Sequence, residues 1–149
     1  MRRLGKINNQ NGAALVEFAI VLPLLLTLIF GMIEFSIMLY DKAMLTNATR
    51  EGARLGILFR TDPIPDTGIG SIPGTVGGYL NNNLISLGGA SNWETVGQTV
   101  VSGTCTAAGA GAPLTVTLTY TYRFLVLPNF ITSLAPTLTL GATTTMRCE

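Results

Sequence analysis

The longest apolar pattern in the chain runs from Gly12 to Leu39 and contains only two charged residues, Glu17 and Glu34. As a helix, its roughly 28 residues would reach about 42 Å, against about 30 Å for the hydrocarbon core of a bilayer. The pattern therefore predicts one helix that spans a membrane with some tilt. Three basic residues precede it: Arg2, Arg3 and Lys6. A basic flank on this side predicts a single-pass protein of the inner (cytoplasmic) membrane, with a cytoplasmic amino terminus and an extracytoplasmic remainder.

The same helix has an internal proline and a polar continuation. Pro23 lies inside the apolar run, where it removes a helical hydrogen bond and predicts a bend. The stretch Asp41–Phe59 is more charged and predicts an extension of the helix beyond the membrane. Gly52 and Gly56 are four residues apart, a spacing that permits close helix approach. This face either docks against the carboxy-terminal domain or a neighbouring subunit, or it is simply a polar face with two glycines.

After the helix, the pattern changes to turn residues and then to strands. Thr61–Gly78 is dense in proline and glycine and predicts a loop, and Tyr79–Leu87 predicts a short helix. From Trp93 onward apolar residues recur at every second position, which predicts strands. The candidate strands are Thr95–Thr106, Leu114–Val126 and Thr137–Cys148. In the second strand, alternate residues should face a core: Leu114, Val116, Leu118, Tyr120 and Tyr122. The expected fold class is α+β: a long amino-terminal helix, then a small extracytoplasmic domain with a short helix and a roughly three-stranded antiparallel sheet.

Composition removes most kinds of chemistry. Only 11% of the 149 residues are charged, nine basic against eight acidic, so no basic nucleic-acid footprint is present. The chain has no histidine, which excludes a Ser-His-Asp or Cys-His arrangement within it. We therefore expect no catalytic residues, no metal site, no cofactor and no nucleic-acid partner. The two cysteines, Cys105 and Cys148, suggest one disulfide in an oxidising exterior compartment, with free thiols as the alternative.

The amino terminus has three interpretations. An ordinary signal peptide is disfavoured, because the apolar run is long and the residues after it offer no small-residue cleavage site. A plain membrane anchor explains the hydropathy but leaves Glu17 without a role, although a carboxylate in an apolar helix is costly. The third interpretation is a prepilin leader. Basic residues, then Gly12, four uncharged residues and Glu17 resemble a type IV prepilin processing site, and this resemblance implies that a membrane-embedded peptidase cuts between Gly12 and Ala13. Glu17 would then be the fifth residue of the mature chain, and the new α-amino group would supply its counter-charge.

Two segments carry a specific resemblance. VEFAIVLPLLLTLIFGMIEF, followed by NATREGARLG, is similar to the TadE/TadG family, pseudopilins of the tight-adherence (Flp) type IV pilus system. The resemblance covers Gly12–Phe35 and Asn47–Gly56. It implies processing by the dedicated prepilin peptidase and a role for the mature helix, rather than a pocket, in pilus assembly. Ala13 departs from the phenylalanine that major type IV pilins commonly have at the first mature position, which argues against a major pilin.

The resemblance divides the chain into a leader (1–12), a membrane helix with its extension (13–60) and an extracytoplasmic domain (61–149). The implied function is that of a pilin-like subunit used in assembly of the pilus, for adhesion or secretion, and not an enzyme. Its partners would be the prepilin peptidase, other pilin or pseudopilin subunits, the assembly machinery and the membrane, with the pilus or cell surface as a further location after assembly. The alternative is a static single-pass anchor that carries an exported β domain as a binding module.

Overall fold

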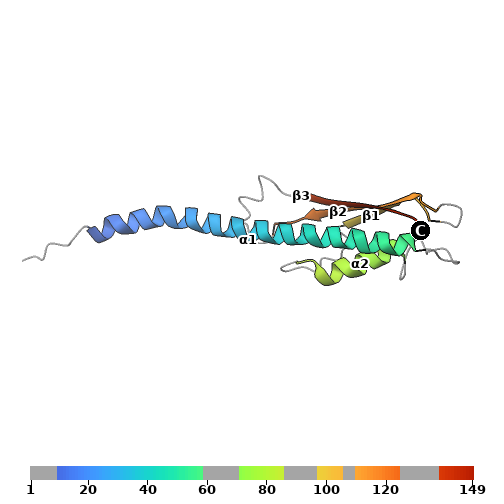
Figure 1. The fold of residues 1–149 in the computed structure, drawn as a ribbon. Coiled ribbons are helices and arrows are strands. Elements are labelled where there is room, and N and C mark those ends of the chain that lie inside the picture. The colour runs from blue at the N-terminus through green and yellow to red at the C-terminus, as the bar shows by residue number, and fades with distance from the viewer. Residues whose placement is uncertain (1–9, 59–70, 86–96, 106–109, 125–137) are drawn as a thin grey trace, which may run out of the picture.

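The computed structural model describes residues 10–58, 71–85, 97–105, 110–124 and 138–149. The elements, in chain order, are helix α1 (Gln10–Ile57), helix α2 (Ile72–Asn83) and strands β1 (Gly97–Ser102), β2 (Pro113–Tyr122) and β3 (Leu138–Arg147). The strands form one antiparallel sheet in the order β1-β2-β3, with β2 in the middle. The expected α+β layout is confirmed (Figure 1).

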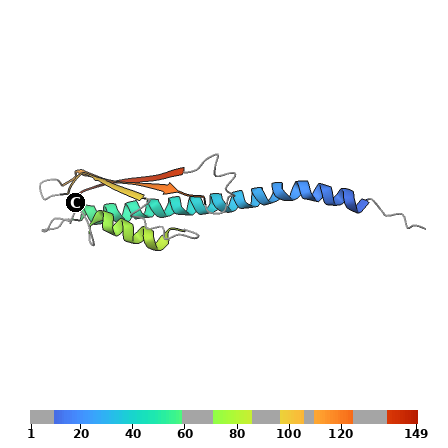
Figure 2. The same cartoon turned by 180° about the vertical axis from the view of Figure 1, so that it is seen from behind.

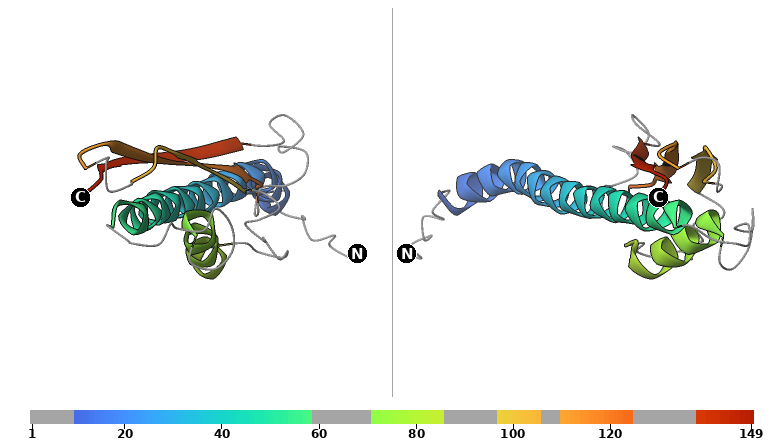
Figure 3. Two further views of the ribbon diagram at one scale, coloured as in Figure 1. Left: turned by 90° about the vertical axis from the view of Figure 1, so that its right-hand side faces the viewer. Right: turned by 45° about the vertical axis from the view of Figure 1, so that its right-hand side comes forward.

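The carboxy-terminal half of α1 is the central layer of the domain. The sheet covers one side of this half and α2 covers the opposite side, while the amino-terminal half of α1 extends beyond both (Figures 1 and 2). The view along the helix shows the same three layers (Figure 3). The domain is therefore built around the end of the same helix that carries the apolar run.

Strand β2 follows the predicted alternation. Its inward-facing side chains are all buried: Leu114, Val116, Leu118, Tyr120 and Tyr122. The threonines between them are half-buried or exposed on the outer face. Successive side chains of a strand point to opposite faces, so this period-two pattern places one face of the sheet on α1.

Helix α1 meets the sheet and α2 through small residues. Ala48 and Ala53 are fully buried at this contact, together with the larger Leu45. A Cβ atom added to Gly52 would lie 2.6 Å from Cγ2 of Val76, and one added to Gly56 would collide with the side chain of Leu114. The two glycines therefore let α2 and β2 approach the α1 backbone, so the domain-docking interpretation of this face is the one confirmed.

A polar contact also crosses the interface between α1 and β3. The hydroxyl oxygens of Thr49 and Thr144 are 2.7 Å apart, and Thr49 also donates to the carbonyl of Thr46. Because the buried Thr49 hydroxyl has partners, its desolvation is compensated.

Helix α2 begins earlier than predicted. The loop predicted over Thr61–Gly78 is wrong for residues 72–78, because the helix starts at Ile72, and the helix predicted to Leu87 already ends at Asn83. The Ser71 hydroxyl accepts a hydrogen bond from the Gly74 amide at 2.9 Å, which caps the first turn. Pro73 fits within that turn, where its missing N–H has no helical partner to lose. Val76 and Leu80 are buried on α1, so packing outweighs the glycine-rich composition.

The strands are shorter than predicted. β1 ends at Ser102 because Gly103 has φ +96°, and a Cβ atom there would collide with the carbonyl of Pro113. β2 ends at Tyr122, whose partner Leu138 is the first residue of β3. The predicted ends at Thr95, Thr106, Val126 and Thr137 lie outside the described residues, as do the leader basic residues. The division at residues 12 and 60 stays a prediction.

The close approach at Gly52 generates a stability prediction. Gly52→Ala should lower the free energy of unfolding by about 1–3 kcal/mol, because the added methyl group overpacks the contact with Val76. Gly31→Ala is the matched control, since its Cβ atom would meet nothing within 4 Å. The control should be neutral or up to about 1 kcal/mol stabilising, as alanine favours helix. Denaturant unfolding of the full chain in detergent measures both, and equal effects would contradict this packing.

Candidate functional site

The residues of the expected processing site lie on the first turns of α1. Gly12, Ala13 and Glu17 are all exposed, and a Cβ atom at Gly12 would meet nothing within 4 Å. Ala13 and Glu17 are four residues apart, so they lie on the same side of the helix, one turn from each other. The bond between Gly12 and Ala13 is therefore free of contacts with the described part of the domain.

The apolar half of α1 is uncovered. From Gly12 to Ile33 no residue is buried, and this part of the helix is long and apolar enough to cross a membrane. Pro23 sits within the helix without ending it, and α1 curves gently in this blue, amino-terminal part (Figure 3). The Thr27 hydroxyl donates to the Pro23 carbonyl at 2.8 Å. That bond satisfies a polar group that would be costly in hydrocarbon.

Glu34 is the first buried residue of α1 and marks the point where the domain begins. Its side chain is 3% exposed, and its Oε1 accepts a hydrogen bond of 2.6 Å from the hydroxyl of Tyr122. Burial raises the pKa of Tyr122, and the bond to Glu34 raises it further. The tyrosine therefore stays protonated and keeps donating to the carboxylate.

A second buried carboxylate lies two turns further along the helix. Asp41 is fully buried, and its Oδ1 accepts a hydrogen bond of 3.1 Å from the Ile85 amide. Burial raises the pKa of Asp41, while the bond from Ile85 opposes that rise. Glu34 thus attaches α1 to the end of β2, and Asp41 attaches it to the chain just after α2.

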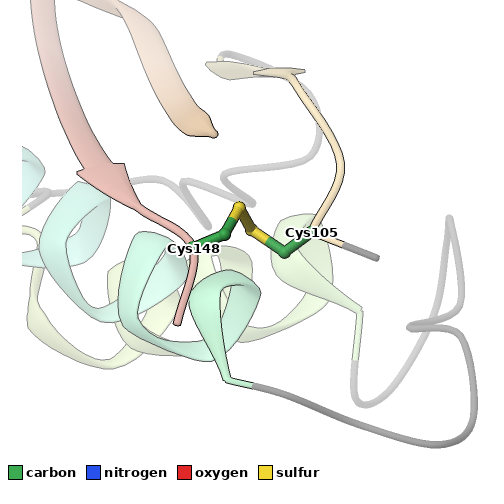
Figure 4. Close-up of a disulfide and its surroundings, with 2 residues drawn as sticks. All are labelled: Cys105 and Cys148. Atoms are coloured by element: carbon green, nitrogen blue, oxygen red, sulfur yellow. A yellow bond between two sulfur atoms is a disulfide. The ribbon is translucent and has the colours of Figure 1, made fainter. Parts of the chain in front are cut away.

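The two cysteines are joined by a disulfide at the opposite end of the domain (Figure 4). Their Cα atoms are 5.4 Å apart and 43 positions separate them in sequence. The bond ties the chain after β1 to the chain after β3, across β2. Cys148 also exchanges backbone hydrogen bonds of 2.9 Å with Gly111 and Ala112. A cross-link of this kind typically contributes about 2–4 kcal/mol.

Glu34 stands out in the sequence as a carboxylate within an apolar helix, but its partner Tyr122 is not evident there. The structure brings together Glu34 with Tyr122 and Cys105 with Cys148, and it leaves Gly12, Ala13, Glu17 and Pro23 apart from both groups. A signal for the Glu34 pair was present: a carboxylate in an apolar helix needs a partner, and an inward-facing tyrosine needs an acceptor for its hydroxyl. Within the described ranges, no three metal-ligating side chains come together.

The bond between Tyr122 and Glu34 generates the second prediction. Tyr122→Phe should lower the free energy of unfolding by about 1–3 kcal/mol, because the buried carboxylate loses this donor. Tyr79→Phe is the control, since the Tyr79 hydroxyl only approaches the Met44 sulfur at 4.0 Å. Thermal unfolding of the full chain in detergent compares them. A loss for Tyr79→Phe as large as that for Tyr122→Phe would contradict a specific role for the bond.

Comparison with known proteins gives a match on part of helix α1. A sequence model described as TadE-like protein matches residues 12–54, which are the apolar half of α1 and most of its buried half. No curated protein and no solved structure matches the chain. The match lies on the helix and includes none of the sheet. Residues 12–54 are thus similar to TadE-like proteins, and among the described residues α1 is the helix that is long and apolar enough to cross a membrane.

Proposed function

We propose that this protein is a pilin-like subunit that a prepilin peptidase cuts between Gly12 and Ala13 before it is used in assembly of the tight-adherence pilus. The observation that carries the proposal is the uncovered apolar surface of α1 from Gly12 to Ile33. Within the described ranges, the residues of α1 that are buried in the chain's own domain begin at Glu34. The amino-terminal half is left for lipid before assembly and for the helices of neighbouring subunits afterwards.

Glu17 has a defined part in this proposal. Cutting after Gly12 creates an α-amino group at Ala13, one helical turn from the Glu17 carboxylate. On the same subunit or on a neighbour, this amino group supplies the counter-charge that a carboxylate in an apolar environment requires. Glu17 therefore aligns subunits, and it has this role only in the cut chain.

The protein acts through its helix and not as an enzyme. The chain contains no histidine, so the commonest general base is missing from its sequence. The exported domain serves adhesion or secretion by placing the sheet and α2 on the outside of the assembly. Its partners are the prepilin peptidase, other pilin-like subunits and the assembly machinery.

Processing is tested by Gly12→Ala, with Gly31→Ala as the matched control. Neither added methyl group meets an atom within 4 Å, and alanine is favourable in helix, so both variants should fold like the parent chain. Intact mass spectrometry of protein from cells with and without the peptidase measures the cut. We expect a chain beginning at Ala13 for the parent and for Gly31→Ala, and an uncut chain for Gly12→Ala.

An uncut parent chain in the presence of the peptidase would overturn the proposal. The same helix would then be a static anchor for an exported binding module. Cutting of Gly12→Ala at the same bond would instead show that Gly12 is not required for recognition.

A further inference from the structure

The end of β2 and the beginning of β3 lie at the level of the helix where the domain meets the uncovered apolar segment. Strand β2 runs back along α1, from Leu114 beside Gly56 to Tyr122 beside Glu34. Tyr122 pairs with Leu138 across the sheet, so the first residue of β3 is at the same level. Figure 1 shows both strand ends facing the free, amino-terminal part of α1.

No spare length of helix separates this level from the membrane. From Gly12 to Ile33 the uncovered segment is roughly 22 residues, or about 33 Å as a helix, and a bilayer core needs about 30 Å. Glu34 follows at once, buried and bonded to Tyr122. If the uncovered segment spans the bilayer, Tyr122 and Leu138 come to lie at the surface of the lipid.

The side chains at this level are those that suit a lipid surface. We define the membrane-proximal tip as Arg123, Phe124 and Leu138. Arg123 is exposed and Leu138 is 40% exposed, although Leu138 is a large apolar residue. The Phe124 ring is half-buried and packs edge-on against Tyr122, with ring centroids 5.9 Å apart. Phenylalanine and leucine side chains on membrane-surface segments bury at the boundary between headgroups and acyl chains, and arginine keeps its charged group among the headgroups.

We infer that the membrane-proximal tip is a second membrane contact, which rests on the phospholipid headgroups beside the spanning helix. Leu138 and Phe124 meet the boundary of the acyl chains, and the Arg123 guanidinium binds headgroup phosphate. The hydrogen bond between Glu34 and Tyr122 fixes the position of the tip along the axis of α1. This inference rests on the membrane placement in the proposed function, but it does not require that the chain be cut.

The direct test uses the unaltered full chain, labelled with ¹⁵N, in lipid nanodiscs that contain a phospholipid with a gadolinium chelate on its headgroup. Amide signals of Arg123, Phe124 and Leu138 should be strongly broadened by the chelate. Those of Gly103 and Gly111 should stay sharp, because β2 separates them from the tip by nearly its whole length. Tip signals as sharp as those of Gly111 would overturn the inference.

A pair of double variants separates contact from mere proximity. Arg123→Glu with Leu138→Ser places a negative charge and a hydroxyl at the tip, and the broadening at Phe124 should fall severalfold. Arg147→Glu with Val100→Ser makes the same charge reversal and a comparable apolar-to-hydroxyl change at exposed positions elsewhere on the sheet, and it should leave the broadening at Phe124 unchanged. Equal broadening in both variants would show that the tip side chains do not hold the domain on the lipid.

The processing proposal and the lipid-contact inference can be contradicted independently of each other. The spanning helix is present whether or not the bond after Gly12 is cut, so an uncut chain should still show a broadened tip. A tip that stays sharp in a chain proven to begin at Ala13 would leave the processing proposal intact and remove only the lipid contact.

Discussion

Helix α1 is continuous, but its surroundings change from exposed to buried at Glu34. The hydrogen bond between Tyr122 and Glu34 lies at that boundary, and the rest of the structure depends on it. From Gly12 to Ile33 no residue of α1 is buried and most are exposed, whereas from Glu34 onward one face is buried beneath the sheet and α2. A buried carboxylate is stable only with donors around it, so the position of Glu34 fixes where β2 can end. The same helix thereby carries its own domain on one half, and in the proposed function its other half contacts lipid or neighbouring subunits.

The second half of α1 explains why a small domain can be stable here. A three-stranded sheet needs a partner for its apolar face, and α1 supplies that partner together with the glycines that allow close contact. The disulfide between Cys105 and Cys148 cross-links the end of the domain that lies farthest from the uncovered segment of α1. The domain is thus held by α1 through its middle, by Glu34 at one end and by the disulfide at the other.

Much of this fold could be predicted from local patterns, and the rest depends on contacts between distant residues. The alternation from Leu114 to Tyr122 predicted the central strand because burial on one face has a period of two. The start of α2 was missed because Gly74 and Gly77 oppose helix, while the Ser71 cap and the packing of Val76 on α1 outweigh them. The partner of Glu34 is 88 residues away, and no local pattern gives that pairing.

The central claim is that α1 belongs to the domain from Glu34 onward and is independent of it before that residue. Its most direct test is thermal unfolding, followed by circular dichroism, of a chain that begins at Glu34 and of a second chain that begins at Leu58. We expect the first chain to be soluble and to unfold cooperatively, close to the midpoint of the full chain in detergent, and we expect the second not to fold. A chain from Glu34 that fails to unfold cooperatively, or a chain from Leu58 that does so, would contradict it.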